Sequence, residues 1–264
     1  MEWILGYAAI GAFVGFFAGM LGVGGGAIII PLLVMLFERQ GLPRGEWLHL
    51  AVGTGMATIL FTSISSVRAH AKRGSVRWDV AARITPGILA GGLAGAFVAK
   101  TFSVFGLAAL FVALVYVLAT NMLLDRKPKP SRQLPGTAGL SAAGFGISFL
   151  SSLIAIGGAA MSVPFMVFCN VPMLQAVGTA AAIGFPIALA GTIGYAVTGW
   201  NAPDLPAWSL GYIYLPALAG ISIASVAFAP LGAMAAHRLP TRRLKQIFAI
   251  LLYVLATRML FALA

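Results

Sequence analysis

Acidic residues are scarce in this chain: only six Asp and Glu occur among its 264 residues. All six lie in expected loops or at the ends of apolar runs, so the sequence predicts no carboxylate in the interior of a membrane span. Carriers driven by protons or sodium ions usually depend on such a carboxylate, and its absence argues against a cation as the substrate.

Metal-binding and catalytic side chains are equally rare, with one cysteine and three scattered histidines. The single Cys169 excludes a disulfide framework. Without clustered His, Cys or carboxylate groups we expect no metal site, no cofactor and no acid–base pair, and therefore no enzyme. A Ser–His intramembrane hydrolase stays open as an alternative, although no Gly-x-Ser-x-Gly sequence occurs.

Charge of any sign is sparse. A soluble domain carries about 25% charged and roughly 45–50% apolar residues, whereas this chain is 9% charged and 60% hydrophobic. Only a bilayer solvates so apolar a surface. The Met1-Glu2-Trp3 start lacks the basic region of a cleaved signal peptide, so we expect the first apolar run to be retained.

The net charge of +11 comes from 17 Lys and Arg that lie mainly in short gaps between apolar runs. A nucleic-acid partner would require a basic face on a soluble module. The observed distribution instead suits the positive-inside signal of membrane topology. We therefore expect membrane lipid and a small molecule as partners, and no nucleic acid, with a homodimer as an open alternative to a monomer.

The apolar runs divide the chain into two halves with the same plan. A membrane helix needs roughly 20 apolar residues. Each half begins with a run that ends at a glycine cluster, continues with a short return segment, and finishes with three full-length runs. The first half has runs at 4–21, 27–37, 47–69, 80–99 and 103–124, and the second at 136–155, 159–169, 174–198, 209–236 and 244–263. The sequence predicts an all-α polytopic membrane protein with transmembrane repeats at 1–124 and 136–264, joined by a linker at 125–135.

Matching residues support a duplication. These matches are Gly24-Gly25 and Pro31 with Gly157-Gly158 and Pro164 at an offset of 133, Ala51-Val52-Gly53-Thr54 with Ala176-Val177-Gly178-Thr179 at 125, Trp78 and Pro86 with Trp208 and Pro216 at 130, and Tyr116 to Thr120 with Tyr253 to Thr257 at 137. The offsets change only where loop lengths differ.

The distribution of positive charge predicts that the two repeats are inverted. Basic residues gather at 68–77, in the linker and at 238–245. The repeat-equivalent of the basic 68–77 loop is the 199–209 loop, whose only charge is Asp204. Equivalent loops then face opposite sides of the membrane, with the linker cytoplasmic and both termini periplasmic. Inverted repeats that contain broken helices are typical of secondary transporters.

The glycine breaks are the first candidates for a binding site. Gly24, Gly25 and Gly26 in the first repeat, and Gly157 and Gly158 in the second, each precede a short helix. The free N–H groups and positive dipole at a helix N-terminus attract anions, and glycine lets an anion approach the backbone closely. The alternative is that these glycines only permit tight helix packing. We predict that they line the site.

Hydroxyl groups are the second candidates. Thr54 and Thr179 lie on the order of 10 Å inside their spans, where they could donate to a substrate oxygen. The alternative is a bond back to a carbonyl of their own helix. Ser162, Ser65 and Ser66 are weaker candidates of the same kind. For His70, near the end of its span, we expect an interfacial anchoring role.

The stretch from Gly15 through Gly22–Gly26 to Pro31, together with Ala51-Val52-Gly53-Thr54 and Lys72-Arg73-Gly74, resembles the TauE/SafE family of sulfite exporter-like (TSUP) transporters. The resemblance covers about residues 6–262. It implies a bacterial inner-membrane transporter that exports a small sulfur-containing anion: sulfite, a sulfonate such as sulfoacetate, or thiosulfate. The alternatives are an anion channel of the same architecture and a membrane assembly protein without transport activity.

Overall fold

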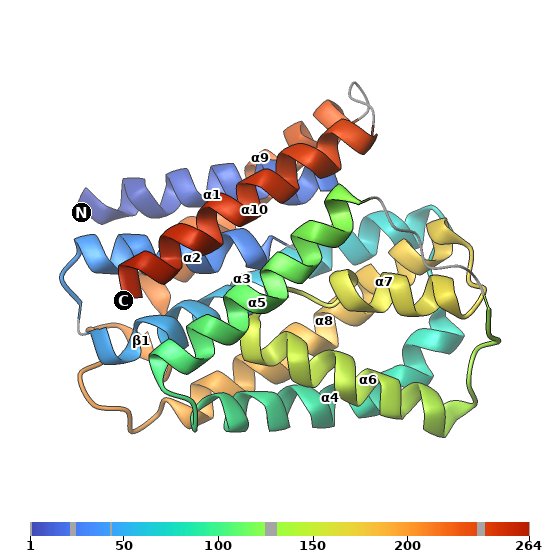
Figure 1. The fold of residues 1–264 in the computed structure, drawn as a ribbon, viewed down its shortest axis with the longest axis horizontal. Coiled ribbons are helices and arrows are strands. Elements are labelled where there is room, and N and C mark those ends of the chain that lie inside the picture. The colour runs from blue at the N-terminus through green and yellow to red at the C-terminus, as the bar shows by residue number, and fades with distance from the viewer. Residues whose placement is uncertain (1, 22–24, 43, 125–130, 237–240, 264) are drawn as a thin grey trace.

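The computed structural model describes residues 2–21, 25–42, 44–124, 131–236 and 241–263 (Figure 1). Almost all of these residues are helical. The elements are α1 (Glu2–Leu21), α2 (Gly26–Arg39), the single 3-10 turn η1 (Arg44–Glu46), α3 (Trp47–Lys72), α4 (Trp78–Ala99), α5 (Val104–Leu123), α6 (Thr137–Ile154), α7 (Ala159–Phe168), α8 (Met173–Thr198), β1 (Ser209–Leu210), β2 (Ile213–Tyr214), α9 (Leu215–Ala236) and α10 (Thr241–Leu263). The predicted all-α class is confirmed apart from the short hairpin.

Five of the described helices are long and apolar enough to cross a membrane: α3, α4, α5, α6 and α8. Shorter apolar stretches occur in α1, α7, α9 and α10. Large apolar side chains stand on the outside of the bundle, for example Leu5 and Phe261, which are 77% and 73% exposed. An apolar exterior of this extent requires lipid around it. The molecule is a multi-pass membrane protein.

The predicted run at 209–236 is wrong at its beginning, because α9 begins only at Leu215. The preceding residues form the antiparallel hairpin β1–β2, in which Ser209 faces Tyr214. The Leu215 N–H donates to the Trp208 carbonyl at 3.1 Å, which closes this loop on itself. Backbone groups committed to the hairpin are no longer free to form helical hydrogen bonds.

Each half packs mainly against the other half. The most extensive helix contacts are α1 with α9 and α4 with α6, so the first helix of each half packs against the fourth helix of the other half. Glycines allow the close approach. A Cβ on Gly87 or Gly91 would overlap the carbonyl oxygen of Ser141 or Phe145 on α6. Such small-residue contacts are typical of membrane helix pairs.

Equivalent helices of the two halves run in opposite directions. In Figure 1, α1 runs from the N-terminus at the left towards the right, whereas α6 runs from right to left. The neighbouring helices α5 and α10 show the same reversal, because α5 rises to the right and α10 returns to the C-terminus at the left. The helices α3 and α8, 26 residues each, are the most buried of the five long apolar helices and form the centre.

The repeated Tyr-x-x-x-Thr motif joins α5 to α10. The Tyr116 hydroxyl lies 2.6 Å from Thr257 Oγ1, and the Tyr253 hydroxyl lies 2.5 Å from Thr120 Oγ1. Each threonine hydroxyl also donates to the carbonyl of the tyrosine on its own helix, at 2.7 Å. The Tyr253 hydroxyl also donates to the Tyr116 carbonyl at 3.4 Å. These contacts hold α5 against α10.

Candidate functional site

The break between α6 and α7 is built by an abrupt change of backbone conformation. Ala155 ends α6 in the left-handed region with φ 43°, and Gly157 follows with φ 86°. In the first repeat, Gly25 precedes α2 with φ 65°, while residues 22–24, including the predicted site residue Gly24, lie outside the described part of the chain. Glycine adopts these positive φ values without the steric penalty that a side chain brings.

The two breaks lie against each other. A Cβ on Gly26 would overlap the carbonyl oxygen of Ala155, and it would lie 3.0 Å from Ile59 Cδ1 of α3. Gly26 and Ala155 are both buried. Broken backbone in a membrane is tolerated where protein or water covers it. Here each break covers the other, and α3 covers both.

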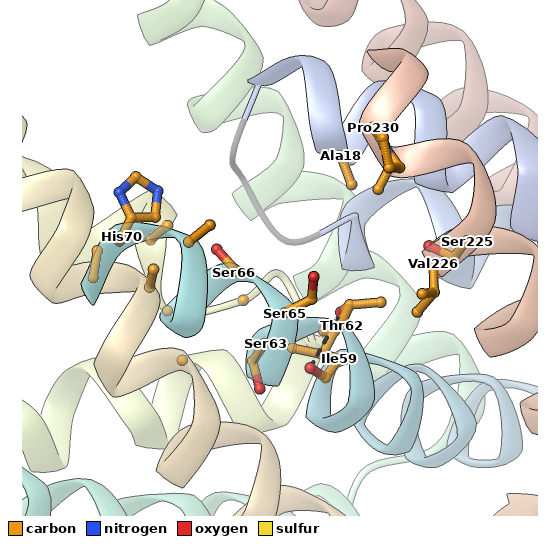
Figure 2. Close-up of a pocket in the computed structure, with 18 of the residues that line it drawn as sticks. Ala18, Ile59, Thr62, Ser63, Ser65, Ser66, His70, Ser225, Val226 and Pro230 are labelled. Carbon is orange, nitrogen blue, oxygen red and sulfur yellow. Dashed lines mark hydrogen bonds between the residues drawn. The ribbon is translucent and has the colours of Figure 1, made fainter. Parts of the chain in front are cut away.

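A cavity of about 360 Å³ opens beside the second break (Figure 2). Its walls come from α3, α8 and α9, with α1 at one edge and the start of α7 at the inner end. The lining residues are Ala18, Ile59, Thr62, Ser63, Ser65, Ser66, Ala69, His70, Arg73, Gly157, Gly158, Ala159, Ala180, Ala181, Gly184, Ser225, Val226, Ala229 and Pro230.

Helix α3 presents the polar wall of this cavity. Its lining residues between Thr62 and Arg73 recur at intervals of three and four, which places them on one face of the helix. Figure 2 shows Ser65, Ser66 and His70 along this face of α3, with Ser225 of α9 on another wall. The Ser225 side chain is only 1% exposed.

The cavity is suited to an anion. Its charged and titratable lining groups are His70 and Arg73, and no carboxylate lines it. Neither of the two ion pairs among the described residues, Glu46–His49 and Arg77–Asp79, involves Arg73. At the inner end lies the N-terminus of α7, where the first N–H groups have no partner within the helix. Positive charge at the mouth and free N–H groups at the base both favour an anionic ligand.

We predict that Arg73→Gln weakens the binding of an anion in this cavity several-fold. An exposed cation at a cavity mouth raises the local anion concentration, and this effect is screened beyond about 8 Å at physiological ionic strength. Anion affinity measured at low and high salt checks the prediction, because the difference from the parent protein should shrink as salt rises. The control is Lys100→Gln, which removes an exposed charge outside the cavity. An equal effect of both variants would contradict the prediction.

The threonine of each Gly-Thr pair binds a loop through a hydrogen bond. The Thr54 hydroxyl of α3 accepts from the Tyr214 N–H at 2.9 Å, and the Thr179 hydroxyl of α8 accepts from the Arg77 N–H at 2.9 Å. Both threonine side chains are completely buried. The arrangement is reciprocal, because α3 holds the connection between α8 and α9, and α8 holds the connection between α3 and α4. This contact differs from both roles that the sequence suggested for these hydroxyls.

The glycine of each pair makes the loop contact possible. A Cβ on Gly53 would overlap the carbonyl oxygen of Tyr212, and a Cβ on Gly178 would overlap that of Ser75. The Tyr212 ring also stacks on His49 at a centroid distance of 5.2 Å. Burial raises the pKa of the Tyr212 phenol, which stays neutral in this position.

The described members of the predicted site therefore fall into four groups. Gly157 and Gly158 line the cavity. Gly25 and Gly26 lie at the other break, where Gly26 contacts the Ala155 carbonyl. The buried Ser162 hydroxyl donates to the Gly158 carbonyl at 2.6 Å and helps to shape the start of α7. Thr54 and Thr179 contact the loops just described.

Sequence reasoning gave too small a role to α3. The sequence makes Ser65 and Ser66 only weaker candidates and predicts an interfacial anchoring role for His70, whereas all three side chains line the cavity. The three-and-four spacing from Thr62 to Arg73 was the signal that could have identified this wall. In the described part of the chain, no group of three His, Cys, Asp or Glu side chains gathers to hold a metal ion.

An apolar exterior, buried helix breaks and a cavity beside them are together typical of membrane transporters. Residues 7–259 match the family described as "Sulfite exporter TauE/SafE", and the chain belongs to that family. It is 37% identical to a probable membrane transporter protein of Haemophilus influenzae over 253 residues, which cover 95% of each chain. It is 25% identical over 264 residues to a probable membrane transporter protein of Methanocaldococcus jannaschii, which cover 95% of this chain and 93% of the relative. No solved structure gives a significant match.

Proposed function

We propose that this protein is a secondary transporter that exports a small sulfur-containing anion by alternating access. The candidate substrates are sulfite, a sulfonate such as sulfoacetate, and thiosulfate. The observation that carries the proposal is the cavity of about 360 Å³ at the base of which Gly157, Gly158 and the start of α7 lie. The family name supports a sulfur oxyanion, and the absence of a lining carboxylate fits a negative substrate.

The architecture that we propose is a pair of inverted-topology repeats. The reversed direction of equivalent helices in Figure 1 and the reciprocal Gly-Thr contacts support this arrangement. In such transporters the two halves exchange conformations around a central site. We place the basic end of α3 and the linker at 125–135 on the cytoplasmic side of the bacterial inner membrane, and both termini on the periplasmic side.

We further propose that the anion contacts the polar face of α3 and the N-terminus of α7. Ser65 and Ser66 supply hydroxyl donors, and Gly157 and Gly158 let the anion approach the free backbone N–H groups. Gly25, Gly26, Ser162, Thr54 and Thr179 would then act around the site, by shaping the breaks and holding the loops, and Gly24 stays a predicted site residue outside the described part of the chain. Moving one negative charge outward through a potential of 100 mV, negative inside, releases about 2.3 kcal/mol. We therefore propose that the membrane potential alone drives export of the anion.

Electrogenic flux into liposomes tests the proposal. We expect the purified protein to produce a saturable current with one or two of sulfite, thiosulfate and sulfoacetate, and none with chloride or taurine. Gly158→Leu should abolish this current, because its side chain fills the base of the cavity and presses on Ile187. Gly146→Leu on the exposed face of α6 is the control and should keep it.

The other candidate functions give different results. Flux that does not saturate and far exceeds carrier turnover would identify an anion channel. Flux driven only by a pH gradient, with no dependence on voltage, would contradict electrogenic export. Silence with every anion, from protein shown to be folded, would favour a membrane assembly role without transport.

A further inference from the structure

The repeat symmetry maps the walls of the cavity onto a second region of the molecule. Ser66 on α3, Ala18 on α1 and Ser225 on α9 all line the cavity. The repeat offsets of 125, 133 and 130 match these residues with Gly191 on α8, Ser151 on α6 and Gly95 on α4, in that order. The second region is thus the seam between α4, α6 and α8. These helices contact one another directly.

This seam is closed in the structure. A Cβ on Gly92 of α4 would lie 2.7 Å from the Ala190 Cβ of α8. A Cβ on Gly191 would lie 3.0 Å from the Met56 methyl group, and Met56 itself is completely buried. One half of the symmetric pathway is therefore open as the cavity, while its counterpart is packed shut.

Three serines of α6 lie buried beside this seam without hydrogen bonds. Ser148, Ser151 and Ser152 are 0% exposed, and within the described part of the chain none of their hydroxyl oxygens has a hydrogen-bond partner. Their spacing of three and four places them on one face of α6. The Ser148 and Ser152 hydroxyls lie 2.8 and 3.4 Å from the position of a Cβ on Gly92.

Close helix packing does not explain these hydroxyls. Alanine would allow the same approach of α6 to α4 without burying an unpaired polar group, which is unfavourable in a dry interior. A hydroxyl that lacks a partner in one conformation is explained if water or a polar ligand meets it in another.

We infer that the α4–α6–α8 seam is the closed half of the transport pathway, and that Ser148, Ser151 and Ser152 become anion-binding hydroxyls of a second cavity when the protein opens to the opposite side. This inference rests on the proposed function and extends it with the residues of the second conformation. The three serines then take the role on α6 that Ser65 and Ser66 have on α3.

Cysteine labelling from each side of the membrane tests the inference. The native Cys169 is first replaced in Cys169→Ala, and Ser66→Cys, Ser151→Cys and Ala108→Cys are introduced singly. A membrane-impermeant maleimide is then applied to right-side-out and to inverted vesicles. We expect Ser66→Cys to react from the side of the basic 68–77 loop and Ser151→Cys to react only from the other side, at least tenfold faster than Ala108→Cys. Ala108 is completely buried on α5, outside the cavity and the seam.

The outcomes separate the inference from the proposed function. If Ser151→Cys reacts no faster than Ala108→Cys, or reacts from the same side as Ser66→Cys, while the parent protein transports anions, the second cavity is wrong and transport stands. If Ser151→Cys reacts from the opposite side but no anion moves, the second cavity stands and anion transport is wrong. Sulfoacetate is the anion to add during labelling, because sulfite itself reacts with maleimides.

Removal of the hydroxyls gives a second measurement. The double variant Ser151→Ala and Ser152→Ala should lower anion flux at least tenfold while its melting temperature stays the same or rises, because the closed state loses only unpaired groups. Ser141→Ala is the control on the same helix, because the Ser141 hydroxyl already donates to the Arg83 carbonyl at 2.8 Å and is not one of the three unpaired serines. Unchanged flux in the double variant would overturn the inference.

Discussion

Gly26→Ala is expected to destabilise the protein by about 3 kcal/mol or more and to abolish transport. The added methyl group would overlap the Ala155 carbonyl, so one helix break must move away from the other. Extra atoms in a well-packed interior typically cost about 1–3 kcal/mol, and more where backbone has to shift. Thermal unfolding in detergent, together with flux in liposomes, measures both effects.

Gly146→Ala is the matched control for this prediction. Gly146 is exposed on α6, and nothing lies within 4 Å of an added Cβ. Alanine is favoured over glycine within a helix by about 1 kcal/mol, so this variant should be at least as stable as the parent. If Gly26→Ala unfolded at the same temperature as Gly146→Ala, the contact between the two breaks would be refuted.

Thr54→Val and Thr179→Val are expected to lower stability by about 1–3 kcal/mol each, which is the usual effect of leaving a buried group without its partner. Valine keeps the shape of the side chain but cannot accept from the Tyr214 or Arg77 N–H. Because the contacts are reciprocal, both variants should have similar melting temperatures and both should slow transport. Unfolding and flux measurements on the two single variants check this.

Thr58→Val provides the comparison. Thr58 is one turn further along α3 and is also completely buried, but its hydroxyl donates to the Thr54 carbonyl of its own helix at 2.9 Å. Its loss leaves no loop N–H unpaired, and the effect on stability should be clearly smaller. An equally large effect at Thr58 would show that burial, rather than the loop contact, determines the result.

The sequence predicted the features that depend on local composition. The runs of apolar residues predicted nearly every helix, and the positions of Gly25 and Gly157 predicted the two breaks. Its error at the beginning of α9 has a simple cause, since Leu210, Ile213 and the uncharged residues around them extend the apolar run of the helix that follows. Hydropathy does not distinguish a short apolar strand from the first turn of a helix.

The partners of the site residues depend on contacts between distant parts of the chain. The Thr54 hydroxyl bonds to Tyr214, 160 residues away, and the Thr179 hydroxyl to Arg77, 102 residues away. The spacing of residues within one helix does not reveal such neighbours. For the cavity, the helical stripe on α3 was visible in the sequence, but only the arrangement of α7, α8 and α9 around it makes it a wall.

The packing of each half against the other also affects how the protein is inserted into the membrane during synthesis. The principal partner of α1 is α9, so Gly11 and Gly15 of α1, which contact the α9 backbone, meet it only after the helices between them have been made. The loop at 74–77 likewise meets its Thr179 contact only after α8 has been inserted. In a ribosome-bound chain that ends after the linker, α1 therefore lacks its partner helix and should stay beside the insertion machinery. Release into the bilayer as a packed bundle would come only after α9 has been inserted.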